Sequence, residues 1–235
     1  MAQFDPRDVC AVVLAGGMGS RMGGVDKGLQ LLAGQALAKH CVQRLEAQTA
    51  GRPGLIAINA NRNADLYAGW GCPVWADELQ GYAGPLAGFE TALQHCTKLP
   101  TGDAAAHQGY RYLLTVACDT PRFPLDLMER LAQALEFAAF GPQGADIAVA
   151  GAQEQDSKGA WTLRPQPVFC LMRTTLAPSL QAFLASGGRK VDAWTAQHRT
   201  VVVAFDQPQD DPRAFFNANT LVELRTLESA PHAPV

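Results

Sequence analysis

The sequence has no block of lysine or arginine, no long apolar run and no charged-then-apolar segment at its start. Its 19 Lys and Arg residues against 22 Asp and Glu leave a net charge of −3, spread along the chain, which argues against a nucleic-acid partner. No apolar stretch approaches the roughly 18 residues of a membrane-spanning helix, and the start does not resemble a signal peptide. We therefore expect a cytoplasmic protein that binds neither nucleic acid nor a membrane.

Cysteine and histidine lack the spacings of metal sites and of nucleophilic triads. The six cysteines include no Cys-x-x-Cys pair, and the five histidines show no metal-ligand spacing. Most of the cysteines lie within apolar runs. They are Cys10, Cys41, Cys72, Cys96, Cys118 and Cys170. This distribution predicts buried, reduced thiols rather than a zinc site or a disulfide framework.

The most informative stretch is the glycine-rich segment 12–28, in which an apolar run ends in a turn. Five glycines fall within nine positions, 16–24, and remove the Cβ atoms that would keep backbone N–H groups from converging on an anion. Arg21 and Lys27 add positive charge. The simpler alternative is that the glycines only form a turn from a strand to a helix, but one or two glycines would usually be enough for such a turn. The segment predicts a cradle for a nucleoside triphosphate.

Two familiar glycine loops do not fit this segment. A P-loop needs Ser or Thr after its lysine to hold Mg²⁺, but Gly28 follows Lys27. A Rossmann dinucleotide fingerprint needs a third glycine where Met22 stands, and the acid expected about twenty residues later has only Glu46, inside a predicted helix, as a candidate. The cradle therefore belongs to another class of nucleotide site.

Strand and helix patterns alternate along the chain with short connections. This order predicts an α/β fold, a three-layer α/β/α sandwich around a mostly parallel, Rossmann-like sheet. We expect strands at 9–14, 55–59, 73–76, 112–117, 146–150, 167–172 and 201–205, helices at 37–45, 86–96, 124–135, 176–184, 191–197 and 221–227, and a loop at 151–159. A single domain is expected at 1–228, with a nucleotide-binding half at about 8–122, an acceptor-binding half at about 123–228 and a disordered tail at 229–235.

Polar residues follow several of the predicted strands. Asp119 comes directly after the strand at 112–117, where a carboxylate is expensive to desolvate unless it is paired or binds a cation. We interpret Asp119 as a Mg²⁺ ligand, with a helix N-cap as the alternative. Asn59 ends the second predicted strand, and Asp77 follows the third. Open α/β sheets bind ligands at the carboxyl ends of their strands, which makes these residues site candidates.

The glycine-rich segment resembles the opening of nucleotidyltransferases with a GT-A-like fold, since residues 14–27 match the pattern L-A-G-G-x-G-x-R-M-G-x-x-D-K. The run from Gly23 to Leu29 is similar to that of the molybdenum cofactor guanylyltransferases, the MobA family, in particular. Further matches are N-A-N-R at 59–62, G-P-L-A-G at 84–88, C-D-T-P at 118–121 and N-A-N-T at 217–220. The resemblance implies the fold of the nucleotide-diphospho-sugar transferases.

The resemblance also implies a reaction and a set of site residues. GMP would pass from GTP to the terminal phosphate of the molybdenum-molybdopterin cofactor, giving a guanine dinucleotide cofactor and pyrophosphate, with Mg²⁺ as the cofactor. Lys27, Arg21 and Asp119 would be catalytic, with Asp119 as the metal ligand. The implied nucleotide-binding residues are Leu14, Ala15, Gly16, Gly17, Lys27, Asn59, Asp77, Gly84 and Asp119. Asn217 and Asn219 would contact the acceptor.

The carboxylate of Asp77 suits guanine in particular. Guanine carries adjacent N1–H and N2–H₂ donors and one carboxylate accepts both, whereas cytosine and adenine offer no such pair. A loop at 84–88 would bring backbone against the base or the ribose. Several relatives carry more basic residues where this chain has 18–20, which leaves Arg21 as the only cation of the loop.

Two other functions are compatible with the same residues. A cytidylyltransferase acting on the same cofactor would share the glycine loop, Lys27 and Asp119. A non-catalytic nucleotide-binding protein that delivers the cofactor to apoenzymes would not need both charged residues. Molybdoenzyme-maturation proteins are the implied macromolecular partners, and a monomer or a weak oligomer is expected.

Overall fold

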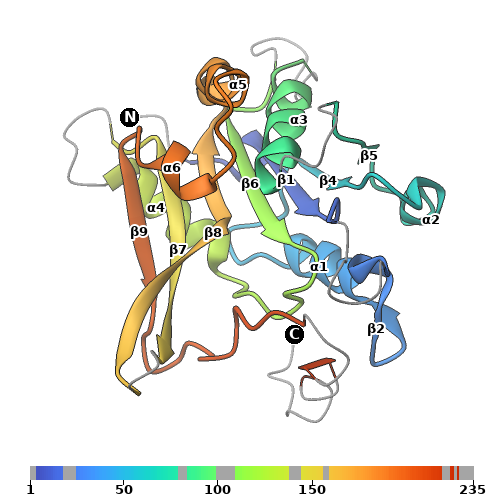
Figure 1. Cartoon of the computed structure of the whole chain (residues 1–235). Helices are drawn as coiled ribbons and strands as arrows, with labels where there is room; N and C mark the ends of the chain where they lie inside the picture. Colours follow the sequence, from blue (N-terminus) through green and yellow to red (C-terminus); the bar gives the residue numbers. More distant parts are fainter. Residues whose placement is uncertain are drawn as a thin grey trace.

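A seven-stranded sheet forms the centre of the computed structural model, in the order β5-β4-β1-β6-β8-β7-β9 (Figure 1). The structure describes residues 4–17, 25–78, 84–98, 109–137, 144–155, 159–218, 223–224 and 227. The strands of this sheet are β1 (Val9–Leu14), β4 (Leu55–Asn59), β5 (Val74–Trp75), β6 (Tyr112–Ala117), β7 (Ile147–Gln155), β8 (Trp161–Arg173) and β9 (Thr200–Phe205). A separate two-stranded sheet pairs β2 (Leu31–Leu32) with β3 (Gln35–Ala36).

The sheet is parallel except at one strand. β1 pairs in parallel with β4 and β6, β4 with β5, and β7 with β9. β8 lies between β6 and β7 and is antiparallel to both. The predicted mostly parallel sheet is therefore confirmed, and β1, β4 and β6 have the predicted bounds. These three strands are apolar runs that helices cover on both faces, which is why their ends can be read from the sequence.

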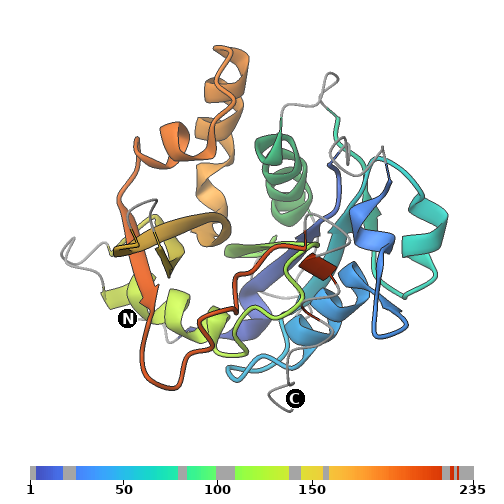
Figure 2. The same ribbon diagram turned by 60° about the horizontal axis from the view of Figure 1, so that its bottom comes forward.

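Helices cover both faces of the sheet (Figures 1 and 2). The helices are η1 (Pro6–Asp8), η3 (Lys27–Leu29), α1 (Leu37–Glu46), α2 (Ala64–Ala68), α3 (Pro85–Lys98), α4 (Leu127–Phe137), η5 (Thr174–Leu176), α5 (Ala177–Ala185) and α6 (Val191–Thr195), where η denotes a 3₁₀ turn. No helix in the described part of the chain is both long and apolar enough to cross a membrane.

The core has two halves, one on each side of the sheet. Val9, Ala11 and Val13 of β1 pack in the half that contains α1 and α4. Cys10 and Val12 point to the other face, into the half that contains α3, α5 and α6. This alternation follows from the period-2 geometry of a strand and completes the predicted three-layer sandwich. All six cysteines are free thiols and five of them are buried, as the apolar runs around them predicted.

The loop predicted at 151–159 is wrong for residues 151–155, which form the outer half of β7. Together with the first half of β8 they make a hairpin that continues past the main core, where Glu154 and Gln155 are exposed. Strand residues that face solvent are polar, so their sequence resembles that of a loop.

β8 begins at Trp161, earlier than the predicted 167. Its pairing with β6 ends at Thr115 and Cys170, so within the described residues its first half pairs with β7 alone. Pro165 lies in that half, where a missing N–H can face away from the ladder. The predicted helix at 221–227 and the tail at 229–235 fall mainly or wholly outside the described residues.

Candidate active site

The candidate site lies at the edge of the sheet where four neighbouring strands end. In the register of the sheet Leu14 of β1 pairs with both Asn59 of β4 and Ala117 of β6, and Asn59 pairs with Trp75 of β5. Because β1, β4, β5 and β6 are parallel, the segments after them meet at this edge, which faces the viewer in Figure 2. The polar residues predicted from strand ends are thus brought to one edge.

Asp77 is held by two asparagines. The side-chain amides of Asn59 and Asn61 each donate to the Asp77 carboxylate, to Oδ1 and Oδ2 respectively, at 2.8 Å. The backbone N–H of Asp77 donates to Asn61 Oδ1 at 2.8 Å, and Asn59 Nδ2 also donates to the carbonyl of Trp75 at 3.1 Å. The carboxylate is therefore fixed in orientation at the end of β5, with acceptor capacity left on both oxygens.

Two glycines allow this cluster to form. A Cβ on Gly16 would lie 3.0 Å from Asn61 Nδ2 and 3.1 Å from Asn59 Oδ1, and one on Gly88 would lie 2.6 Å from Asn59 Oδ1. In contrast, no heavy atom of the described residues, other than those of its chain neighbours, lies within 4 Å of a Cβ built on Gly17. A side chain at Gly88 would thus force Asn59 to move and one at Gly16 would crowd both asparagines, whereas Gly17 is exposed.

The predicted helix at 86–96 is confirmed and begins one residue earlier than expected, so that of the loop predicted at 84–88 only Gly84 lies outside the helix. Pro85 starts α3, consistent with the preference of proline for the first helical position, and the residues through Gly88 form its first turn. Gly84 precedes the helix with φ +71°, a left-handed conformation suited to glycine. The site therefore contains a helical turn that packs on the ends of β1 and β4, through Gly88, rather than an open loop.

Lys27 and Asp119 form an ion pair across the site. Lys27 Nζ donates to Asp119 Oδ2 at 3.2 Å, and the two side chains are 23% and 15% exposed. Lys27 belongs to the 3₁₀ turn η3, and Asp119 follows β6. The pair joins η3, which follows the glycine loop, to the segment after β6, and it holds a positive and a negative charge close together in the site.

The turn that carries Asp119 is held from three sides. The N–H of Cys118 donates to the carbonyl of Leu14 at 3.2 Å, and the N–H of Ala218 donates to the carbonyl of Asp119 at 2.8 Å. The Cys41 thiol on α1 lies 3.4, 3.6 and 3.8 Å from the carbonyl oxygens of Ala117, Cys118 and Thr120, and its single S–H can donate to any one of them. Burial, and then the charge of Asp119, raise the pKa of the Cys41 thiol, which keeps it a donor.

Asn217 reaches this turn from the late part of the chain. Its side-chain oxygen accepts a hydrogen bond from the hydroxyl of Thr120, while the Asn217 side chain remains exposed. The predicted acceptor residue is therefore next to Asp119. The other one, Asn219, and the predicted catalytic Arg21 lie outside the described residues, as does the rest of 18–24.

Three residues that follow β4 contact the site but were not predicted from the sequence as site residues. Arg62 Nη2 donates to the carbonyl of Gly17 at 3.3 Å, which brings a second cation to the glycine loop besides the predicted Arg21. Tyr67 and Asn63 contact Asp26, the neighbour of Lys27. The N-A-N-R motif was a signal for Arg62, but nothing local in the sequence marks Tyr67.

A metal in this site would have one protein carboxylate. Among the described residues no group of three or more His, Cys, Asp or Glu could hold a metal ion. Asp119 Oδ2 accepts from Lys27, and no hydrogen bond from the described residues to Oδ1 is found. A hard carboxylate oxygen of this kind fits Mg²⁺, which keeps several waters and binds through one or two carboxylates and substrate phosphates.

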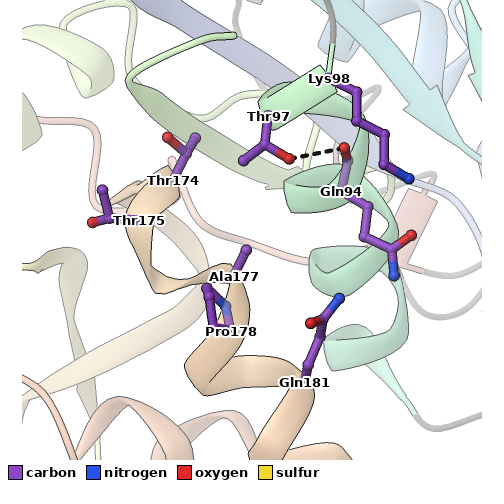
Figure 3. Close-up of a pocket in the computed structure, with 8 residues that line it drawn as sticks. All are labelled: Gln94, Thr97, Lys98, Thr174, Thr175, Ala177, Pro178 and Gln181. Carbon is purple, nitrogen blue, oxygen red and sulfur yellow. Dashed lines mark hydrogen bonds between the residues drawn. The ribbon is translucent and has the colours of Figure 1, made fainter. Parts of the chain in front are cut away.

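A separate pocket of about 570 Å³ lies between α3 and the start of α5 (Figure 3). α3 contributes Gln94, Thr97 and Lys98, and the segment after β8 contributes Thr174 and its neighbours. β8 is antiparallel to β6, so its end lies at the edge opposite Asp119. The pocket is therefore not part of the candidate site.

Comparison with known proteins agrees with this geometry. Residues 11–201 match the family described as MobA-like NTP transferase domain. The chain is 54% identical over 225 residues to a molybdenum cofactor guanylyltransferase of Albidiferax ferrireducens, covering 96% of this chain and 98% of the relative. It is 50% identical over 224 residues to the Bordetella petrii protein of the same name, covering 95% and 99%.

Solved structures show the same fold at lower identity. Molybdopterin-guanine dinucleotide biosynthesis protein A from Archaeoglobus fulgidus superposes with a TM-score of 0.68 at 20% identity, covering 94% of this chain and 96% of that one. The 4-diphosphocytidyl-2C-methyl-D-erythritol synthase of Anaerococcus prevotii has a TM-score of 0.65 at 10% identity, covering 94% of each chain. The predicted nucleotidyltransferase fold is therefore confirmed.

Proposed function

The chain belongs to the MobA-like NTP transferases, and from this membership we propose that it transfers GMP from GTP to the terminal phosphate of the molybdenum-molybdopterin cofactor. The products are molybdopterin guanine dinucleotide and pyrophosphate. The strongest support from the structure is the Lys27–Asp119 pair, which joins η3 to the segment after β6 at the edge of the sheet where β1 and β6 end.

The triphosphate lies along the glycine loop. The backbone from Leu14 to Gly17 leaves the end of β1 at the edge where the other strand ends meet. Arg62 brings positive charge to the carbonyl of Gly17, and Arg21 of the same loop is proposed to add to it. Together with Lys27 these groups offset the negative charge of the phosphates, so the loop does not depend on a single arginine.

Guanine is recognised by Asp77. Asn59 and Asn61 each use one acceptor site on the carboxylate, and the remaining lone pair on each oxygen is free to accept from N1–H and N2–H₂ of the base. Cytosine presents no such donor pair, which is the chemical reason to favour GTP over CTP. Gly84 lies directly before α3, whose Gly88 packs on Asn59 at this end of the site.

Asp119 is the residue that would hold Mg²⁺, with the metal's remaining positions filled by phosphates and water. When bound, the metal neutralises charge on the phosphates and polarises the α-phosphate. The Asp119 carboxylate is oriented by the bonds that fix its turn to β1, α1 and Ala218.

Lys27 stabilises the charge that develops during transfer. An oxygen of the acceptor's terminal phosphate forms a bond to the α-phosphorus of GTP, and the bond from that phosphorus to the bridging oxygen breaks, so that pyrophosphate leaves. The Lys27 ammonium is proposed to face the α-phosphate or the leaving oxygen. Negative charge grows there in the transition state, so the ammonium stabilises the transition state more than the ground state. Asn217, which is exposed and bonds to Thr120 beside Asp119, is proposed to contact the acceptor, and Asn219 is proposed to act with it.

The test is pyrophosphate release from GTP and molybdopterin cofactor by the wild type, Asp119→Ala and Asp192→Ala. Asp192 is an exposed acid on α6 and serves as the control. We expect Asp119→Ala to lose at least about 100-fold in kcat, and Asp192→Ala to stay near the wild type. Wild-type release from Asp119→Ala would contradict the metal assignment, and no release from the wild type would favour a non-catalytic delivery protein.

A further inference from the structure

Asp26 is a buried acid that precedes Lys27. Only 9% of it is exposed, and no lysine or arginine of the described residues forms an ion pair with it. Its oxygens accept from neutral donors instead: Oδ1 from the hydroxyl of Tyr67 at 2.6 Å and the N–H of Gly28 at 3.1 Å, and Oδ2 from Asn63 Nδ2 at 2.9 Å. A buried carboxylate is unfavourable without such partners, so this cluster constrains Asp26 strongly.

The cluster fixes the turn that carries Lys27. The Asp26 side chain caps η3 through Gly28, and the Tyr67 hydroxyl oxygen packs so closely on Gly28 that a Cβ there would collide with it. The carbonyl of Gln30, which follows η3, accepts a hydrogen bond from the N–H of Leu37 at the start of α1, at 2.8 Å. The backbone of Lys27 is therefore held at both ends of its turn.

A fixed backbone matters for a lysine because its side chain is long and flexible. Ordering a lysine side chain costs rotamer entropy, so an anchored Cα reduces the number of conformations that the side chain must search to reach the reactive position. A displacement of about 1 Å can lower a rate by about 100-fold. Lys27 Nζ lies 3.2 Å from Asp119 Oδ2, and the anchor of its turn is the Asp26 cluster.

The same donors connect Lys27 to the rest of the site. Tyr67 and Asn63 belong to the segment 59–67, which also supplies the asparagines on Asp77 and the arginine on the glycine loop. Asn63 adopts φ +53°, which turns its amide toward Asp26. The chain that holds the base-recognition residues thus also holds the lysine turn.

We propose that Asp26 is a positioning residue for Lys27, and that Tyr67 and Asn63 hold Asp26 in the orientation that directs the lysine ammonium at the reacting phosphate. The proposal rests on the catalytic role proposed above for Lys27. It assigns the three residues no contact with substrate.

The experiment is a double-mutant cycle on the full-length protein, with Tyr67→Phe and Lys27→Ala separately and combined. Tyr67→Phe removes one hydrogen bond to a charged group and keeps the ring. We expect it to lower kcat by about tenfold, with KM for GTP within about twofold of the wild type. In the Lys27→Ala background the same change should have no further effect on kcat, because the group that it positions is gone.

Two further variants separate positioning from folding. Tyr112→Phe is the matched control, since Tyr112 is equally buried and donates to Glu136 at 2.8 Å at the opposite end of the sheet. It should leave kcat unchanged. Asn63→Gly keeps the left-handed backbone and removes the other donor, so it should also lower kcat, by a smaller factor, even if Tyr67→Phe folds poorly.

The outcomes distinguish the two proposals. Equal losses from Tyr67→Phe in the wild-type and Lys27→Ala backgrounds, or wild-type kcat in both Tyr67→Phe and Asn63→Gly, would overturn the positioning role while leaving Lys27 catalytic. Wild-type turnover by Lys27→Ala would instead remove the proposed role of the lysine itself, and the positioning role with it.

Discussion

Asp77→Asn tests how the site selects its base. The asparagine has nearly the same shape as the aspartate but only one acceptor oxygen, and its new NH₂ group must face either Asn59 Nδ2 or Asn61 Nδ2, which now donate to Asp77 at 2.8 Å. The substitution therefore removes the negative charge and one of the two acceptors proposed for guanine, and it places a donor against a donor.

The expected size of the effect comes from this count of hydrogen bonds. Loss of a two-point contact to a base edge costs about 1–3 kcal/mol, which corresponds to a fall of about 5- to 150-fold in kcat/KM for GTP. Inosine triphosphate lacks the 2-amino group of guanine. The wild type should therefore prefer GTP to ITP, and Asp77→Asn should lose most of that preference.

The assay is dinucleotide formation with GTP or ITP, Mg²⁺ and molybdopterin cofactor. Glu78→Gln is the matched control, because it removes the same charge from the next residue, whose side chain is exposed. It should change kcat/KM by less than about twofold. If Asp77→Asn kept both the wild-type kcat/KM for GTP and the preference over ITP, Asp77 would not be the group that recognises the base.

Three further predictions concern packing and pH. Gly88→Ala places a Cβ 2.6 Å from Asn59 Oδ1, so it should lower both GTP affinity, by calorimetry, and stability, by about 1–3 kcal/mol in denaturant unfolding; unchanged values for both would contradict the packing described. Burial raises the pKa of Glu90, whose folded form therefore keeps its proton longer than the unfolded chain does. Stability from this group falls as pH rises above the unfolded pKa, and Glu90→Gln should flatten that slope in unfolding curves between about pH 4 and 7; an unaltered slope would refute it. Hydrogen bonds from Arg199 lower the pKa of Asp146, so its contribution to the free energy of unfolding is present above the unfolded pKa near 3.9 and is lost as pH falls through the lower folded value. Asp146→Asn should therefore lose less stability than the wild type on acidification below about pH 4. An identical acid midpoint would count against the pair.

Much of the site could be predicted because its residues come directly after buried parallel strands. Apolar runs fix the ends of β1, β4 and β6, and parallel strands bring the segments after them to one edge. The position of Asn59 and Asp119 at one edge can therefore be predicted without knowing any contact between residues far apart in the sequence. The glycine loop indicated an anion by its composition alone, and its lysine is now paired with Asp119.

The supporting contacts could not be predicted because they join residues far apart in the sequence. Tyr67 lies 41 positions from Asp26, on the short helix α2, which is too brief to show a helical period. The first turn of α3 resembles a loop in the sequence because Gly84 and Pro85 are typical of turns as well as of helix starts. The outer hairpin of β7 and β8 extends past the main core, so polar residues such as Glu154 and apolar ones such as Trp161 are both exposed there and no regular alternation marks the strands.

From the sequence we expect Arg21 to be the only cation at the glycine loop, but the structure brings a second arginine to it. Arg62, which follows β4, reaches the carbonyl of Gly17. The last residue of the N-A-N-R motif, which was not among the site residues predicted from the sequence, thus supplies charge to a loop that lies 45 positions earlier in the chain.

The transferred nucleotide and its acceptor can be identified directly by product analysis. The protein is incubated with Mg²⁺, molybdopterin cofactor and GTP, CTP or ATP in separate reactions. We expect a guanine dinucleotide of the cofactor and an equivalent of pyrophosphate with GTP, and little product with CTP or ATP. A cytosine dinucleotide from CTP with no product from GTP would contradict this expectation.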